Sequence, residues 1–327
     1  TIEEPFVIVD EASMIDVYLF SELLSSLSDG TNLLLVGDEN QLPSVGAGLI
    51  LRDLIESKKV PTIVLNKVFR QEEGSRLVFN DHAMKDGLGI GRENGPVFNE
   101  KRSDGSLGDT FFVRASSTER TKKQVIEAYK KLLSRGMDFK EILVLTATNG
   151  GDLGTLNLNH QLQRACFKHS DSDPVLIRKR DNSAFYIGDP VIQLINDYDN
   201  NVFNGETGVV ISINNLPNGS KSMDVCFESE DPNEEDRIVT YSGFKVYDIN
   251  LAYAITIHKS QGSEARAVIM VVDSIHTRSL NRSLIYTGYT RTKELNIIIG
   301  QEDTFNQAIA NTSNLERVSL VKERLNQ

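Results

Sequence analysis

The sequence predicts an α/β protein whose parallel sheets are covered by helices and interrupted by one β-rich segment. Short apolar runs alternate with stretches of helical periodicity toward both ends of the chain, which is typical of parallel strands joined by helices. Several of these runs end in a carboxylate or an amide, as buried strands do when they deliver polar groups to the carboxyl edge of a sheet. From 185 to 246 the pattern changes to short strand-like runs separated by turns such as Asn-Gly.

The N-terminal part of the chain is expected to hold three strands and three helices. Strand-like runs lie at 6–9, 32–36 and 62–65, and apolar residues have helical spacing at 16–27, 48–57 and 76–84. The segment 85–109 is rich in Gly, Asn and Asp and is expected to be a loop that links two domains. We therefore predict a first domain over residues 1–108.

A second α/β unit is expected after that loop. Helices are predicted at 118–133, 156–167 and 281–290, and strands at 142–146, 252–257, 267–272 and 295–299. The β-rich runs at 190–195, 208–213, 223–227 and 237–241 indicate a small β-barrel. We therefore predict a second domain over 109–186 and 249–327, with the barrel inserted over 187–248.

Composition limits the class of protein. The 327 residues, 39% hydrophobic and 25% charged, suffice for two or three domains. The apolar runs are shorter than the ~20 residues of a membrane span, so we expect a cytoplasmic protein without a membrane partner. A net charge of -11 excludes a protein that coats nucleic acid by bulk electrostatics, but not one with a narrow basic channel. Cys166 and Cys226 lie far apart and are expected to be buried thiols.

Two adjacent carboxylates, Asp10 and Glu11, follow the first predicted strand. Phosphoryl transfer from ATP needs Mg²⁺ near the phosphates and a water molecule in line with the bond that breaks. We expect Asp10 to serve the metal and Glu11 the water. The alternative is an acid pair at the start of a helix, which the preceding buried strand disfavours.

The next strand ends in Gly37-Asp-Glu-Asn-Gln41, and Leu42-Pro-Ser-Val-Gly46 follows. The Gln41 amide can reach a γ-phosphate or the attacking water. A loop with nucleotide at one end and another surface at its other end suits a coupling element, although a tight Gly/Pro turn would give the same pattern.

Two arginines are candidates for stabilising charge on a transferring phosphoryl group. Arg70 follows the third predicted strand, and Arg291 ends a helix of the second unit. A guanidinium donates two hydrogen bonds at once and stays charged, so two such groups from separate domains can close on one phosphate. Each arginine alone could equally form a surface salt bridge.

The whole series of motifs resembles the superfamily 1 DNA helicases of the RecD/TraA group, which include the exodeoxyribonuclease V α-subunit. It comprises Phe6-Val-Ile-Val-Asp-Glu-Ala-Ser13, the run ending at Gln41, Val68-Phe-Arg-Gln71, Ile257-His-Lys-Ser-Gln-Gly262 and Tyr286-Thr-Gly-Tyr-Thr-Arg291. The resemblance implies two RecA-like P-loop NTPase-type domains, the first incomplete, with an SH3-like β-barrel inserted in the second. It also implies 5′ to 3′ movement on single-stranded DNA, with ATP and Mg²⁺ as cofactors.

Roles for single residues follow from the same resemblance. Asp10 and Glu11 match the Walker B motif, 37–46 matches motif III, Arg70 motif IV, 257–264 motif V and 286–291 motif VI. The implied nucleotide contacts are Asp10, which also binds Mg²⁺, Glu11, Gln41, Arg70, Gly262, Glu264 and Arg291. The implied catalytic groups are Asp10, Glu11, Gln41, Arg70 and Arg291.

Two features depart from the family pattern. The sequence has no G-x-x-x-x-G-K-S/T phosphate loop. We expect the chain to be the C-terminal portion of a longer helicase and to have little ATPase activity alone. Motif VI has Tyr289 where the group more often has a small apolar residue, which leaves the packing around Arg291 less defined.

Single-stranded DNA is usually held by hydroxyl, amide and backbone groups on loops. Three loops of this chain are candidates, and the family uses equivalent loops in this way. Their residues are Pro43, Ser44 and Val45; Thr146, Thr148 and Asn149; and Thr256, His258, Lys259 and Ser260. His258 could instead be a structural hydrogen-bonding residue.

The expected partners are single-stranded DNA, duplex junctions and subunits of a helicase-nuclease complex. Two other functions stay open at this point. One is a non-catalytic nucleic-acid-binding or scaffold subunit that kept the fold, and the other is the motor part of a conjugative relaxase. The set of phosphate-facing residues disfavours a pure scaffold, which has no physical need for them.

Overall fold

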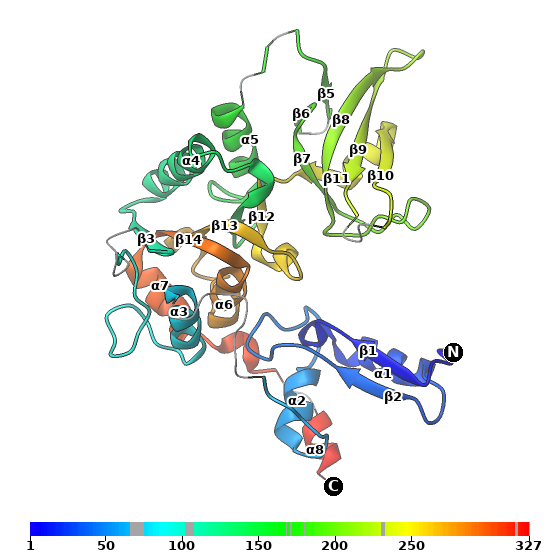
Figure 1. Cartoon of the computed structure of the whole chain (residues 1–327), viewed down its shortest axis with the longest axis vertical. Helices are drawn as coiled ribbons and strands as arrows, with labels where there is room; N and C mark the ends of the chain where they lie inside the picture. Colours follow the sequence, from blue (N-terminus) through cyan, green and yellow to red (C-terminus); the bar gives the residue numbers. More distant parts are fainter. Residues whose placement is uncertain are drawn as a thin grey trace.

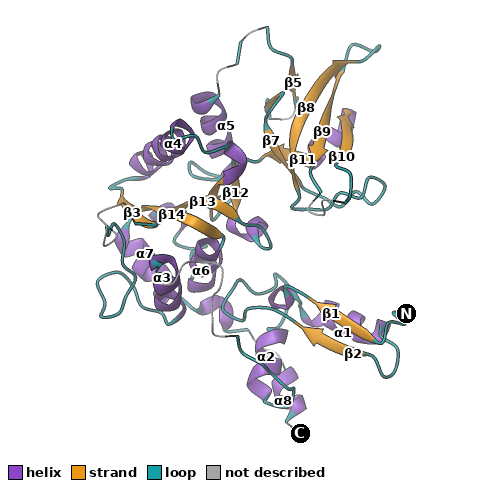
Figure 2. Cartoon of the chain, viewed as in Figure 1, coloured by secondary structure: helices purple, strands orange, loops and turns teal. Residues whose placement is uncertain are grey.

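The chain folds into an N-terminal unit, a central five-stranded sheet with helices on both faces, and a β-rich insertion (Figures 1 and 2). This computed structural model describes residues 1–65, 75–101, 108–167, 169–170, 172–179, 181–229, 233–317 and 320–326. No helix in these ranges is long and apolar enough to cross a membrane.

The N-terminal unit is built on two parallel strands, β1 (Phe6–Val9) and β2 (Asn32–Leu35). Helices α1 (Val17–Ser26) and α2 (Ile50–Ser57) follow them, with a 3-10 turn at Ala12–Met14. Its small core consists of Ala12, Ile15 and Leu51 with their neighbours. The opposite sheet face is open, because Phe6 and Ile8 are 55% and 60% exposed.

The central sheet is parallel, with strand order β12-β4-β13-β14-β3. The strands are β3 (Thr110–Arg114), β4 (Ile142–Thr146), β12 (Ala254–Thr256), β13 (Ala265–Val272) and β14 (Thr292–Gly300). Strand β13 is apolar and buried on both faces from Ala267 to Val272, and only Arg266 near its start is charged and exposed. Its alternate residues enter two separate cores: Ile269 lies on one side of the sheet and Met270 on the other.

Helices cover both faces of this sheet. Helices α4 (Thr118–Ser134) and α5 (Thr155–Cys166) pack on one face, and α3 (Arg76–Lys85), α6 (Arg282–Thr290) and α7 (Glu302–Ala310) on the other. Side chains at the starts of two helices satisfy free backbone N–H groups: Ser117 accepts a hydrogen bond at α4 and Asn281 at α6. Helix α8 (Val321–Leu325), near the C-terminus, returns to the N-terminal unit and packs on α2 (Figure 1).

The insertion is a five-stranded antiparallel sheet with order β10-β9-β8-β7-β11. Its strands are β7 (Pro190–Gln193), β8 (Thr207–Asn215), β9 (Lys221–Phe227), β10 (Arg237–Ser242) and β11 (Ile249–Leu251). A small hairpin of β5 (Val175–Ile177) and β6 (Ala184–Tyr186) precedes it. The 3-10 segment Gly243–Asp248 joins β10 to β11.

Most expected elements are confirmed, with shifted ends. The predicted strand at 62–65 is wrong: the segment is irregular, Ile63 is 89% exposed, and among the described residues no strand pairs with it. Strand β3 and the short strands β5, β6 and β11 were not predicted. The expected helix at 76–84 forms, and its Leu77 and Met84 pack in the core of the second sheet. The division at 1–108, 109–186 with 249–327, and 187–248 stays a prediction.

The cysteines are free, and both are half-buried where full burial was expected. Cys166 ends α5, and burial raises the pKa of its thiol to about 11. A thiol with so high a pKa is protonated at neutral pH and is a poor nucleophile.

A buried arginine joins the β5–β6 hairpin to the insertion. Arg178, only 6% exposed, donates hydrogen bonds to the carbonyl oxygens of Val246 and Ile249 and to Asn250. It also pairs with Asp181. Although burial raises the pKa of this carboxyl, hydrogen bonds from Arg178 and Ser183 bring it down to about 2.

Replacing Arg178 by Ala should destabilise the insertion by about 3 kcal/mol, because two buried carbonyl groups and Asp181 lose their donor. Urea denaturation followed by tyrosine fluorescence would measure the loss. The matched control is Lys179→Ala, which removes an adjacent exposed cation and should change the free energy of unfolding by less than about 0.5 kcal/mol. Equal effects of the two substitutions would contradict this role.

Candidate functional site

The loop after β1 places two carboxylates at the carboxyl edge of the N-terminal sheet. Asp10 is exposed and its Oδ1 accepts a hydrogen bond of 2.7 Å from the backbone N–H of Glu11. Glu11 lies in the left-handed region, with φ 51° and ψ 38°, and turns the chain sharply into Ala12. The Ala12 N–H then bonds the carbonyl oxygen of Val36, which ties this loop to the end of β2.

Asp10 suits a magnesium ligand. Its carboxylate is exposed and only one oxygen is engaged by Glu11. Among the described residues there is no group of three or more His, Cys, Asp or Glu side chains that could enclose a metal. A single exposed carboxylate such as that of Asp10 fits Mg²⁺, which is usually held by one or two carboxylates together with phosphate oxygens and water.

A glycine lets the loops after β1 and β2 approach each other. A Cβ atom at Gly37 would lie 3.0 Å from the backbone nitrogens of both Ala12 and Ser13. Any larger residue would push these loops apart. Gly37 therefore keeps the Asp10–Glu11 loop beside the segment that leads to Gln41.

Gln41 and Arg291, which are 250 residues apart in the sequence, are in direct contact. The Oε1 atom of Gln41 accepts a hydrogen bond of 3.1 Å from Nη2 of Arg291. Arg291 is only 4% exposed, and it also donates to the carbonyl oxygens of Thr287 at 3.1 Å and Ser263 at 3.4 Å. These bonds fix the direction of the guanidinium.

Leu42, the residue after Gln41, adds two backbone hydrogen bonds to the contact between the N-terminal and central units. The backbone N–H of Leu42 donates to Thr287 Oγ1 at 2.8 Å, and its carbonyl oxygen accepts from Gln261 Nε2 at 3.1 Å. The side chain of Leu42 is buried in the core of the central unit. The segment after β2 is thus held by α6 and by the loop at 257–264.

Motif V contributes both a side chain, that of Gln261, and a backbone carbonyl to this junction. Gly262 has φ +76°, a value that favours glycine, and is exposed. Glu264 lies 3.3 Å from Lys293 in an ion pair. The carbonyl oxygen of Ser263, between them, is the group that contacts Arg291.

A second polar junction joins the same two units. The hydroxyl of Tyr286 donates to Asp38 Oδ2 at 2.8 Å. Asp81, on α3, lies close enough to be affected by the charge of Asp38, and its Oδ1 is buried without a hydrogen-bond partner among the described residues. Burial, and then the negative charge of Asp38, raise the pKa of Asp81 to about 7, while Lys85 opposes the shift.

The predicted DNA-contacting residues differ in exposure. Val45 is 91% exposed, whereas Ser44 beside it is buried. Pro43 is half-buried, Asn149 is exposed, and its Oδ1 accepts from Thr155. Thr146, Thr256 and Ser260 are buried with their hydroxyls hydrogen-bonded inside the protein. In those three, the side chain shapes its loop.

Two residues at the start of motif V are desolvated by the protein around them. His258 is exposed, yet this desolvation lowers its pKa and favours a neutral imidazole. Burial likewise lowers the pKa of Lys259, whose Nζ lies 3.4 Å from Asn204 Oδ1 in the β7–β8 loop. The insertion therefore lies next to motif V.

The sequence did not identify two residues of this region, His276 and Arg317. Thr148, a predicted contact, shares a hydrogen bond of 3.1 Å with Nε2 of His276, which is only 4% exposed. Arg317 contacts the loop after Gln41 from the C-terminal segment. No local pattern marks either residue. The predicted Arg70 lies outside the described residues.

Family models match three parts of the chain. They are an AAA domain over residues 2–91, the ATP-dependent RecD-like DNA helicase SH3 domain over 158–227, and the UvrD-like helicase C-terminal domain over 251–299. The chain is 32% identical over 317 residues to the ATP-dependent RecD2 DNA helicase of Deinococcus radiodurans, covering 95% of this chain and 39% of that protein. The chain belongs to the RecD-like superfamily 1 helicases.

The chain is also similar to other RecD proteins. The chain is 26% identical to the RecBCD enzyme subunit RecD of Buchnera aphidicola and 28% identical to that of Mycolicibacterium smegmatis, and it covers 55% and 51% of these proteins. It thus spans about half the length of these two relatives. Its fold is similar to that of the Pif1 helicase from Bacteroides in complex with ADP-AlF3 and ssDNA, with a TM-score of 0.51, 18% identity and coverage of 95% of this chain and 73% of that chain. The SH3-like domain of the family accounts for the predicted inserted barrel.

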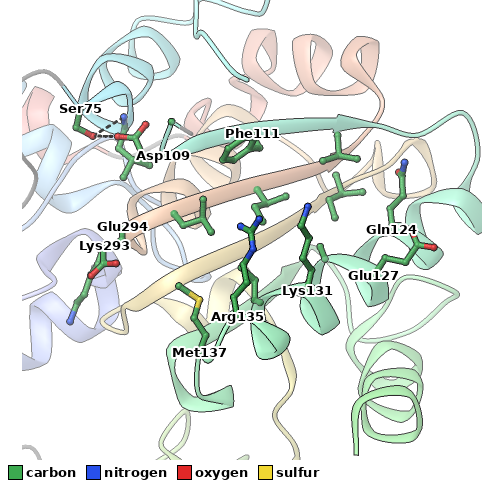
Figure 3. Close-up of a pocket in the computed structure, with 18 residues that line it drawn as sticks. Ser75, Asp109, Phe111, Gln124, Glu127, Lys131, Arg135, Met137, Lys293 and Glu294 are labelled. Atoms are coloured by element: carbon green, nitrogen blue, oxygen red, sulfur yellow. Dashed lines mark hydrogen bonds between the residues drawn. The ribbon is translucent and has the colours of Figure 1, made fainter. Parts of the chain in front are cut away.

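A large pocket lies apart from this candidate site. It has a volume of about 890 Å³ and lies between α4 and the edge of the central sheet (Figure 3). Phe111 of β3 and Ile297 of β14 line it from the sheet, and Lys131 and Arg135 line it from α4. None of the predicted site residues lines it.

The pKa of Asp81 gives a prediction about stability. The folded protein binds the proton of the Asp81 carboxyl more tightly than the unfolded chain does. The stability that this proton contributes is therefore fully present below about pH 4 and is lost as the pH rises through about 7. Asp81→Asn should therefore stabilise the protein more at pH 8 than at pH 5, by about 3 kcal/mol, because the folded-state pKa of about 7 lies about two pH units above pH 5. Chemical denaturation at both values would measure it.

The matched control is Asp86→Asn, which changes an exposed carboxylate at the end of the same helix and should act alike at both pH values. If the free energy of unfolding falls by the same amount between pH 5 and pH 8 in the wild type and in Asp81→Asn, Asp81 does not titrate as described.

Proposed function

We propose that the chain is the motor portion of an ATP-dependent DNA helicase that moves 5′ to 3′ on single-stranded DNA and unwinds duplex junctions. The observation that carries this proposal is the hydrogen bond between Gln41 and Arg291. Two residues expected to face the same phosphate come from separate units, and the fold brings them together. A nucleotide bound there would be sensed by both units at once.

Each group at this junction has a distinct task in the proposed reaction. Glu11 would orient the attacking water, and Gln41 would contact that water or the γ-phosphate. Arg291 would stabilise the charge that develops on the transferred group, since its direction is already set by Thr287 and Ser263. Mg²⁺, with Asp10 as its protein ligand, would neutralise phosphate charge.

Coupling to DNA would run through the loop that begins at Gln41. A change at Gln41 alters the position of Leu42, whose backbone is bonded to both α6 and Gln261. The same loop continues to Pro43, Ser44 and Val45, which we propose contact the DNA strand. Closing and opening of the two units would then move this contact along the phosphate backbone.

Partners and location belong to the same proposal. Several relatives are named as the RecD subunit of the RecBCD enzyme. We propose that the parent protein acts on DNA in the cytoplasm and can assemble with nuclease or helicase subunits in the same way. The scaffold alternative has no observation in its favour among the described contacts.

The decisive measurement is ATPase turnover with and without single-stranded DNA. This chain should be compared with a version extended upstream through a phosphate loop. Turnover is expected in the extended protein only, and Glu11→Gln should lower it at least about 100-fold because the water loses its orienting carboxylate. DNA binding, measured by fluorescence anisotropy, should remain.

Glu22→Gln is the matched control, since it removes an exposed carboxylate of α1 away from the strand ends. It should leave turnover unchanged. An extended protein that binds DNA but never hydrolyses ATP would overturn the helicase proposal and favour the non-catalytic subunit.

A further inference from the structure

The C-terminal segment crosses back from the central unit to the N-terminal unit. After α7 the chain passes along 311–317 and ends with α8 against α2 (Figure 1). Lys322 of α8 forms an ion pair of 2.7 Å with Glu56 of α2. Hydrogen bonds from Lys322 and Arg52 lower the pKa of Glu56, so this carboxylate is charged at neutral pH.

On this path Arg317 binds the loop that follows Gln41. Its Nη1 atom donates to the carbonyl oxygens of Ser44 and Gly46, the latter at 2.8 Å. These two carbonyl groups flank Val45, whose side chain is 91% exposed at the loop tip. One nitrogen therefore holds both sides of the tip.

The rest of the loop has little freedom to rearrange. The N–H of Ser44 donates to the carbonyl oxygen of Ser13 at 3.1 Å. The N–H of Val17 donates to the carbonyl oxygen of Ala47 at 3.0 Å. A Cβ atom at Gly46 would lie 1.9 Å from Asp16 Oδ2, so the backbone there is packed directly on the start of α1. Arg317, on the C-terminal segment that crosses from the central unit, holds the carbonyl groups on both sides of Val45.

We propose that Arg317 is a positioning residue that holds the tip at 43–46 in the conformation that contacts single-stranded DNA. This inference rests on the proposed function, and it adds a residue outside the helicase motifs to the coupling path. Because Arg317 belongs to a segment anchored in both units, the shape of the tip depends on how those units are placed. The loop is then controlled at both ends: by Gln41 with Arg291 on the nucleotide side, and by Arg317 on the DNA side.

Hydrogen–deuterium exchange on the 327-residue chain tests the contact itself. Arg317→Ala should raise the exchange rate of amides in the peptide 40–49 about tenfold or more, because the tip loses its support. Arg317→Lys keeps one donor and should show a smaller increase. Arg324→Ala removes an exposed arginine of α8 and should leave the peptide unchanged.

The second readout is the coupling ratio of the extended protein, defined as ATPase turnover with saturating single-stranded DNA divided by turnover without it. Arg317→Ala should lower this ratio about fivefold or more, and Arg317→Lys should restore part of it. A purely structural arginine would lower both turnover values together and leave the ratio unchanged. Should Arg317→Ala fail to fold, the comparison of Arg317→Lys with wild type keeps both tests in force.

The outcomes separate this inference from the proposed function. Unchanged exchange at 40–49 in Arg317→Ala, or faster exchange with an unchanged coupling ratio, overturns the positioning role even where the extended protein is a DNA-stimulated ATPase. An extended protein without any ATPase activity overturns the proposed function, and the exchange data still decide whether Arg317 holds the tip.

Discussion

A buried guanidinium ties together the parts of this molecule that carry its proposed activity. Arg291 is almost fully buried, and removing a charge from water is costly unless its N–H groups find acceptors. Its acceptors include a carbonyl of α6, a carbonyl of motif V, the amide of Gln41 and the hydroxyl of Thr290. Because each must be in place to satisfy Arg291, the ends of β2 and α6 and the motif V loop have fixed relative positions.

From this junction a short chain of contacts leads to the exposed tip at Val45. The backbone groups of Leu42 are bonded on both sides, Ser44 is bonded to Ser13, and Arg317 holds the carbonyl groups around the tip. Few residues separate the proposed nucleotide end from the proposed DNA end, so little motion can be absorbed between them. A stiff path of this kind suits a motor, in which hydrolysis at one end must displace a strand at the other.

The insertion is attached firmly to the central unit. Asp189, only 1% exposed, accepts hydrogen bonds from Tyr253, Gln163 and the N–H of Tyr186, which join β7 to α5 and to the chain leading into β12. Lys259 of motif V reaches Asn204 of the β7–β8 loop. The SH3-like domain is therefore held beside the proposed DNA-contacting loops even though its sequence is largely acidic.

The sequence by itself determined the parallel α/β architecture, the β-rich insertion and the polar groups after the first two strands, which we propose face the nucleotide. Hydrophobic periodicity is a local signal, and Asp10, Glu11 and Gln41 could be found because each follows an apolar strand. The run at 62–65 has the same local signal but pairs with no strand in the part of the chain that the structure describes, and only the fold could reveal that. The tertiary structure alone decided that Tyr286 meets Asp38, that His276 meets Thr148 and that Arg317 supports the tip at 43–46. These pairs are separated by more than a hundred residues and leave no trace in local spacing, because the free energy that brings them together comes from the burial of the whole core.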